Sequence, residues 1–155
     1  MMSNSYNQHI LALLHHLIGN ACYAGLKFDI DQAMTAKASH FNKRGETDWN
    51  SFASSCPKSE TALQLISQHG SFNKAKKHLR IEHSKPMNLL IKELRIDPTI
   101  NKIHTVLESY HVTIITREED RLLTKAKLNS KMPLDWDGKD PYARYHAVGI
   151  VVIKQ

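Results

Sequence analysis

The residues with the clearest chemical potential in this chain are an adjacent acid and imidazole, Glu82 and His83, followed by Ser84 and Pro86. A carboxylate can bind a divalent metal ion, and a neighbouring imidazole can act as a general base that activates water. The same residues also suit the entrance of a helix, because Ser is a favoured N-cap and Pro fits the first helical turn. The sequence therefore leaves two interpretations open: a hydrolytic metal site or a helix start.

Positive charge is concentrated around this pair. Residues 72–95 contain seven Lys or Arg residues and two acids, a formal net charge of +5, whereas the whole chain carries +6. A concentrated field attracts polyanions better than the same charge spread evenly. The pattern predicts a nucleic-acid-binding surface, although a solvated basic face explains it equally well. The residues that we expect to contact phosphates here are Lys74, Lys76, Lys77, Arg80 and Lys85.

The Glu82-His83 pair with Pro86 after it resembles the opening of the ββα-metal (HNH-type) nuclease motif. In that family an acid–His pair ends a strand, the His activates water and the acid binds a metal. The resemblance therefore implies that Glu82 and His83 are catalytic and that the cofactor is a divalent metal ion. It covers about six residues of the chain, counting from Ile81 to Pro86.

The downstream part of that motif has no clear counterpart in this sequence. Asn88 comes too early, and Asn101 and His104 stand three residues apart on a separate expected helix. A third ligand in the same cleft, such as His104 or Asp137, would favour the nuclease. Otherwise we expect Glu82 to pair with a neighbouring Lys or Arg.

A second group of chemically active residues lies near the C-terminus. Asp135, Asp137 and Asp140 occur in one expected loop with Trp136 between them. Capping and turn formation explain Asp140 and the Asp137-Gly138 dipeptide, and Trp136 would anchor the loop in the core. Beside this loop, Arg144 and Tyr145 would be able to contact a phosphate and stack a base.

Composition limits the class of protein. The chain has 155 residues, of which 41% are hydrophobic, and it lacks an apolar run long enough to span a bilayer. We therefore expect a cytoplasmic protein without a membrane partner. Its two cysteines, Cys22 and Cys56, are expected to be reduced and mostly buried. No P-loop, G-x-G-x-x-G or G-x-S-x-G motif is present.

Apolar periodicity and capping residues predict the elements that position these groups. The expected helices cover residues up to 24, 29–43, 47–55, 57–69, 86–94, 97–107 and 116–125. Ser71 would cap the basic segment, and Asp140-Pro141 opens a further short helix. The expected strands are 112–116 and 149–153, which are able to pair in parallel or antiparallel orientation, and 79–82 suits a strand or a helix end. The Asp29-to-Gln32 and Thr116-to-Glu119 spacings resemble capping boxes. The predicted fold class is α+β and mainly α-helical, with a two- or three-stranded sheet in the C-terminal half. We expect one domain over residues 1–155, helical to residue 70 and mixed thereafter.

These observations favour an intracellular protein that binds nucleic acid through residues 72–95 and Arg144. One alternative is a small metal-dependent nuclease centred on Glu82 and His83. Another is an interaction module whose basic face binds an acidic protein. Whether the protein is an enzyme stays open at this point.

Overall fold

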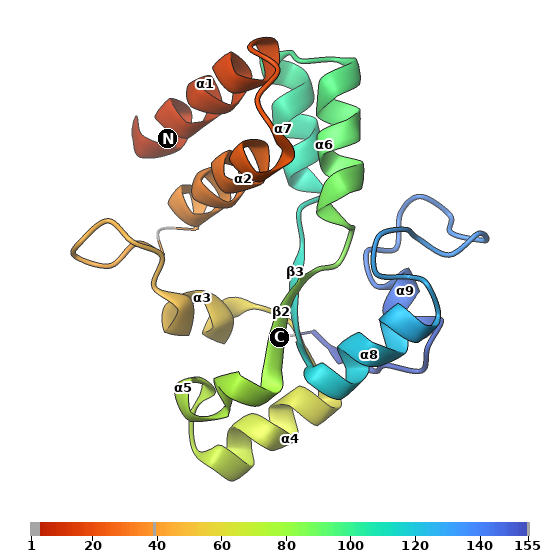
Figure 1. Cartoon of the computed structure of the whole chain (residues 1–155). Coiled ribbons are helices and arrows are strands. Elements are labelled where there is room, and N and C mark those ends of the chain that lie inside the picture. Colours follow the sequence, from red (N-terminus) through yellow and green to blue (C-terminus); the bar gives the residue numbers. More distant parts are fainter. Residues whose placement is uncertain (1–3, 39, 155) are drawn as a thin grey trace. The chain divides into compact units, whose positions relative to one another are not determined.

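The structure is a computed structural model that describes residues 4–38 and 40–154, and its elements fall into two compact units (Figure 1). Unit 1 comprises Met1–Phe52 and Met87–Tyr110, and unit 2 comprises Ala53–Pro86 and His111–Gln155. The chain thus leaves unit 1, builds the first part of unit 2, returns to unit 1 and then completes unit 2. A division of the sequence at residue 70 did not predict that each unit is built from two segments.

Unit 1 is helical. Its long helices are α1 (Asn4–Ile18), α2 (Tyr23–Lys37), α6 (Met87–Ile96) and α7 (Ile100–Glu108), and α3 (Trp49–Ser55) crosses the boundary to unit 2. Apolar side chains at helical spacing form one core, in which Leu13, Ile30, Leu90 and Ile103 are completely buried. Burial of such side chains stabilises the unit by about 1.5–3 kcal/mol for each one.

Two helix boundaries in unit 1 differ from the sequence expectation. α1 ends at Ile18 and not near residue 24, because Gly19 and Asn20 follow and Asn20 takes a left-handed backbone with φ of 54°. α2 begins at Tyr23, so Asp29 lies inside the helix and does not cap one. Its buried carboxylate instead lies 2.6 Å from Nδ1 of His16 on α1. The capping-box interpretation of Asp29 was wrong, because its carboxylate contacts the His16 side chain and not a backbone N–H at a helix start.

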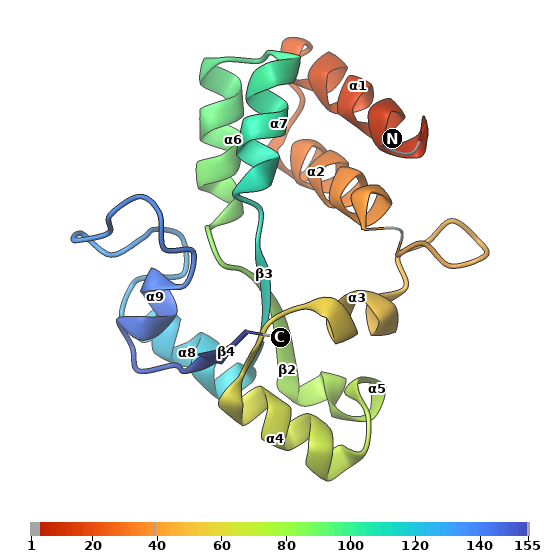
Figure 2. The same cartoon turned by 180° about the vertical axis from the view of Figure 1, so that it is seen from behind.

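Unit 2 contains a four-stranded sheet with the order β2-β3-β1-β4. Figure 2 labels β2, β3 and β4 in this unit. The strands are β1 (Lys58–Ser59), β2 (Leu79–His83), β3 (Val112–Thr116) and β4 (Val152–Ile153). β3 is fully buried and pairs with β2 in antiparallel and with β1 in parallel orientation, while β4 is antiparallel to β1. The fold is therefore α+β and mainly helical, as the sequence predicted.

The two strands expected from the sequence, now β3 and β4, do not pair with each other. β1 lies between them, and it consists of only two residues, Lys58 and Ser59. A strand this short has no detectable alternation, and Ser59 also caps α4 by accepting a hydrogen bond from the N–H of Ala62 at 3.1 Å. The sequence predicted this helix but placed its start at residue 57 instead of Glu60, so the strand immediately before it was missed.

Unit 2 also contains the helices α4 (Glu60–His69), α5 (Phe72–Ala75), η1 (Lys76–His78, a 3₁₀ helix), α8 (Arg117–Lys125) and α9 (Ala143–His146). Of these, α4 and α8 pack against strands of the sheet. The sequence predicted the capping box that starts α8, in which Thr116 and Glu119 bond each other's backbone. A second apolar core includes Ile115, Leu123 and Tyr145, all fully buried.

The two cysteines have different environments, one in each unit. Cys22 is exposed, so the expectation that both thiols are mostly buried was wrong for this residue, whereas Cys56 is buried. Burial raises the pKa of the Cys56 thiol to about 11, although Lys58 and Ser55 act in the opposite direction. A raised pKa leaves this thiol neutral near pH 8, and the neutral form is a poor nucleophile.

We expect an aromatic disulfide reagent at pH 8 to modify Cys22 about a hundredfold faster than Cys56 in the native protein. In denaturant both thiols should react at one rate, because the environment that distinguishes them is lost. The Cys22→Ser variant is the control, and it should lose the fast phase only. Two equally fast thiols in the native protein would contradict this arrangement.

Candidate functional site

The basic segment at residues 72–95 is divided between the two units. Residues 72–86 belong to unit 2, whereas α6 carries Lys92 and Arg95 into unit 1. The division occurs because Pro86 ends the extended chain after β2 and Met87, 4% exposed, begins an amphipathic helix whose apolar face fills the unit 1 core. One run of positive charge in the sequence is therefore divided between two units.

The two units differ sharply in charge. Unit 1 contains seven Lys or Arg residues and seven Asp or Glu residues, so its formal net charge is zero. Unit 2 contains 14 Lys or Arg residues and eight acids, a formal net charge of +6. All of the net positive charge of the chain thus resides on unit 2. An electrostatic partner of opposite sign would be attracted to this unit specifically.

Three lysines of this segment lie in unit 2, in the short helices α5 and η1 that follow the turn after α4. Gly70 ends α4 with φ of 81°, a backbone that favours glycine, and Ser71 caps α5 by accepting from the N–H of Lys74 at 3.3 Å. Ala75 is completely buried and anchors these short helices, which leaves the neighbouring lysines exposed. We call Lys74, Lys76 and Lys77 the lysine cluster.

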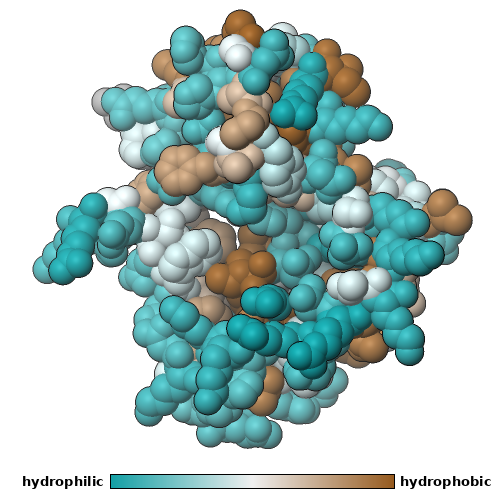
Figure 3. All heavy atoms as spheres, viewed as in Figure 1, coloured by the Kyte–Doolittle hydropathy of each residue, from teal (hydrophilic) through white to brown (hydrophobic). Residues whose placement is uncertain are grey.

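The lysine cluster has no local negative charge to neutralise it. None of its ammonium groups has an ion-pair partner among the described residues. The chain contains no Asp or Glu from residue 61 to residue 81. Figure 3 shows hydrophilic side chains over the α4–α5 end of the molecule on the face in view. The cluster therefore offers three solvated cations that an incoming anion can contact without displacing a carboxylate.

Arg80 and Lys85, also expected to contact phosphates, have partners of their own. Arg80 on β2 is about half exposed, and its Nε lies 3.6 Å from a carboxylate oxygen of Asp120 on α8. Lys85 is half-buried, and its Nζ lies 5.8 Å from the centroid of the Trp136 ring. Exposed ion pairs are weak, so Arg80 is able to exchange Asp120 for a phosphate at small cost. Lys85 is less accessible than the lysine cluster.

Arg144, expected from the sequence to contact a phosphate, lies inside unit 2 with 1% of its surface exposed. Its guanidinium group donates to the carboxylate of Glu82. It also donates to backbone carbonyl oxygens of residues 83, 84, 128 and 129, including Ser84 at 3.0 Å and Leu128 at 2.8 Å. Tyr145 beside it is completely buried. In this structure Arg144 and Tyr145 are therefore internal groups, and a surface role for them does not agree with their burial.

Glu82 and His83 form the end of β2, opposite Thr113 and Val112 of β3. Arg144 is the direct partner of the Glu82 carboxylate, which matches the ion-pair interpretation of this residue. Burial raises the pKa of Glu82 above its usual range, even though Arg144 acts in the opposite direction. A metal ion at this carboxylate would have to compete with a buried guanidinium group.

The proposed third metal ligands, His104 and Asp137, have partners of their own. His104 belongs to unit 1, where its Nδ1 is 3.4 Å from the hydroxyl of Tyr6. Asp137 is in an exposed turn and accepts the N–H groups of Lys139 and Asp140, which lower its pKa. Among residues 4–38 and 40–154, no three His, Cys, Asp or Glu side chains are grouped so that they could hold a metal ion.

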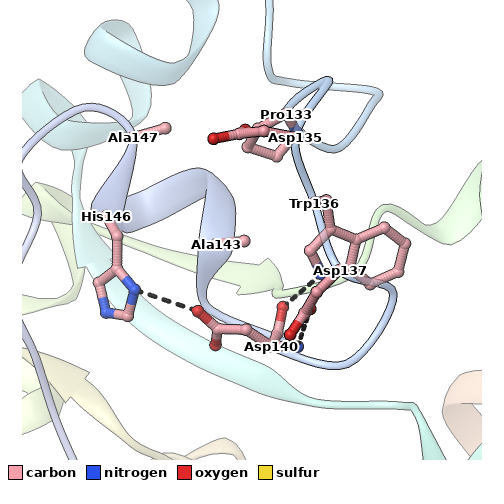
Figure 4. A pocket seen from close by; sticks show the side chains of 8 residues that line it. All are labelled: Pro133, Asp135, Trp136, Asp137, Asp140, Ala143, His146 and Ala147. Atoms are coloured by element: carbon pink, nitrogen blue, oxygen red, sulfur yellow. Dashed lines mark hydrogen bonds and ion pairs between the residues drawn. The ribbon is translucent and has the colours of Figure 1, made fainter.

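A pocket of about 380 Å³ opens beside α9 (Figure 4). Its polar lining consists of Asp135, Asp137, Asp140, Trp136 and His146. The Nδ1 of His146 is 3.2 Å from Asp140, and the Trp136 indole donates to the backbone carbonyl of Asp140 at 2.7 Å. Three carboxylates at one pocket repel phosphate groups, so this pocket does not extend a nucleic-acid surface. Its side chains are explained by the turn and by the start of α9.

Sequence reasoning missed the pairing of two histidines next to the lysine cluster, His69 at the end of α4 and His78 at the end of η1. The acid-free run from residue 61 to 81 includes both residues and is the signal that points to them. The tertiary fold brings the two rings together, with their centroids 5.2 Å apart.

Comparison of the chain with protein-family models, with curated proteins and with solved structures finds no match. Nothing in the described part of the chain is a helix that combines the length and apolar character required to cross a bilayer. The function must therefore be inferred from the geometry and charge of the two units themselves.

Proposed function

We propose that this protein binds nucleic acid through unit 2, with the lysine cluster as the main phosphate contact. The observation that carries this proposal is the division of charge, +6 on unit 2 and zero on unit 1. Phosphate contacts dominate the affinity of non-specific nucleic-acid binding, and lysines without acidic partners are suited to make them. Arg80 is a further candidate for a phosphate contact, because its partner Asp120 holds it only in a weak, partly exposed ion pair.

The support for this proposal is electrostatic, so the contribution of each basic residue follows from how exposed its charge is. Partly buried Lys85 contributes less than the cluster, and buried Arg144 contributes to folding only. Residues 69–80 around the lysine cluster contain a single Phe and no Tyr or Trp to stack bases, so we expect backbone contacts and little base specificity. Binding should therefore depend strongly on salt and weakly on nucleotide sequence.

The direct test is fluorescence anisotropy with labelled single-stranded DNA, duplex DNA and single-stranded RNA, each of about 20 nucleotides. Affinity should fall linearly with the logarithm of salt concentration between about 50 and 200 mM. Absence of binding at the lowest salt would overturn the proposal. A protein that binds equally well at all salt concentrations would also contradict it, because phosphate contacts release counterions.

Replacing all three members of the lysine cluster with alanine is expected to reduce the slope of log K against log salt by about two on single-stranded DNA. The matched control replaces three exposed lysines of unit 1, Lys37, Lys43 and Lys92, and should leave the slope unchanged. Lys92 is an informative part of this control, because it belongs to the basic segment 72–95 but lies in unit 1. Equal losses in the two triple variants would mean that the lysine cluster is not the binding surface.

A further inference from the structure

The rings of His69 and His78 form a stacked pair beside the lysine cluster. Their centroids are 5.2 Å apart and their planes are inclined by 26°. His69 belongs to the last turn of α4 and His78 to the end of η1, so the turn at Gly70 and Ser71 brings them together. Both rings are partly exposed, and solvent or a ligand can reach them.

This pair differs from other histidines of the chain in its partners. His16 contacts Asp29, His146 contacts Asp140 and His40 contacts Ser51 through their Nδ1 atoms. The ring nitrogens of His69 and His78 have no hydrogen-bond partner in the described part of the chain. Their donors are therefore available to a ligand.

The acidic groups on the elements around the pair have other partners or lie away from it. The pair is carried by α4 and η1; α5, β1 and β3 pack against α4, β2 follows η1 directly, and α8 packs against β2. Apart from α8, the charged residues of these elements are Lys74 on α5, Lys76 and Lys77 on η1, Glu60 on α4, Lys58 on β1, and Arg80 and Glu82 on β2, with none on β3. On α8, Asp120 pairs with Arg80, Glu118 pairs with Arg121, and Glu119 accepts from Ser59 and Thr116; its other charged residues are Arg117 and Lys125. Glu60 begins α4, nine residues before His69 and so about 13 Å along the helix. Lys58 and Glu82 are bonded to groups inside unit 2. No carboxylate among these therefore lies ready to balance a protonated ring.

We propose that His69 and His78 form a proton-gated phosphate contact within the nucleic-acid surface of unit 2, an inference that rests on the function proposed above. A neutral imidazole has one N–H donor, and a protonated one has two and a positive charge. Protonation of both rings would place two cations side by side next to three lysines. A phosphate that contacts both rings relieves this repulsion, so proton uptake and polyanion binding favour each other.

We therefore expect the affinity of the protein for nucleic acid to rise on mild acidification, and this rise to depend on His69 and His78. The imidazole ring is the side chain that ordinarily changes charge between pH 5 and 8. Each added cation that contacts a phosphate strengthens binding in the same way as a lysine. The ligand chemistry is that of a phosphodiester, and the lysine cluster supplies the part of the affinity that does not depend on pH.

The test measures binding of the labelled single-stranded DNA at pH 7.5 and pH 5.5 at constant salt. The wild type should bind about tenfold more tightly at the lower pH. The double variant His69→Gln/His78→Gln should keep its affinity at pH 7.5 and lose most of this gain. The control His9→Gln/His15→Gln removes two imidazoles from unit 1, whose net charge is zero, and should behave as the wild type. Calorimetry near pH 6.5 in buffers of different ionisation enthalpy should show proton uptake that the first double variant reduces.

The outcomes separate the two proposals. If the wild type binds with a normal salt dependence and the His69/His78 variant keeps the full pH gain, only the proton-gated contact is overturned. If the wild type does not bind at either pH, the proposed function fails and the gate fails with it. If both double variants lose the gain equally, the effect comes from overall charge and not from this pair.

Discussion

The Arg144→Met variant is expected to lose about 3–5 kcal/mol of the free energy of unfolding of unit 2. The substitution keeps most of the side-chain volume and removes the guanidinium group. The Glu82 carboxylate would then be left without its cation, and the carbonyl oxygens of Ser84 and Leu128 would lose a donor. Removing Arg144 is costly because the Glu82 carboxylate, with 27% of its side chain exposed, is only partly hydrated and loses its cation.

Urea unfolding followed by tryptophan fluorescence measures this loss. The chain has one tryptophan in each unit, so in a Trp49→Phe background the remaining Trp136 reports on unit 2. The matched control is Arg121→Met, since Arg121 is 76% exposed and pairs with an exposed Glu118. That control should change the stability by less than about 0.5 kcal/mol. A loss below about 1 kcal/mol for Arg144→Met would show that the buried bonds contribute little.

The second large effect is expected from Glu119→Ala, which should destabilise unit 2 by about 3 kcal/mol. Glu119 is 7% exposed and accepts from the hydroxyl of Ser59 at 2.6 Å and from the N–H of Thr116 at 2.8 Å. Ser59 in turn caps α4, and Thr116 caps α8, so one carboxylate connects the starts of two helices. Alanine leaves two buried donors without an acceptor and removes a negative charge from the N-terminus of α8.

The neighbouring residue supplies the control for this experiment. Glu118→Ala removes an exposed carboxylate from the same turn of the same helix and should cost less than about 0.5 kcal/mol. Trp136 fluorescence in the Trp49→Phe background again reports the unfolding of unit 2. Equal effects of the two substitutions would mean that the helix dipole, and not the buried bonds, accounts for the stabilising role of Glu119.

Local patterns predicted much of the secondary structure, because their causes lie within a few residues. The β-branched run from Val112 to Thr116 became β3 with those bounds, and the Thr116–Glu119 capping box formed as expected. Ser71 caps α5, also as its position suggested. In each case the determining interaction is between residues at most four positions apart, so the sequence displays it directly.

The candidate site was less accessible to sequence reasoning. Lys74, Lys76 and Lys77 are exposed, as a basic run on a short helix indicates, but Arg144 is buried although its type is usually found at the surface. Its partner Glu82 lies 62 positions away, and no local rule pairs two residues so distant in the chain. The stacked pair of His69 and His78 was missed for a similar reason, since a turn of the chain brings the rings together.

The sequence by itself determined that this protein is mainly helical with a small sheet, and that its excess positive charge is concentrated around residues 72–95. The tertiary structure decided how that charge is used. It assigned Lys92 and Arg95 to a unit without net charge and left the lysine cluster on a unit of +6. The physical reason is that charge adds up over a surface, and a surface is composed of segments that only folding brings together.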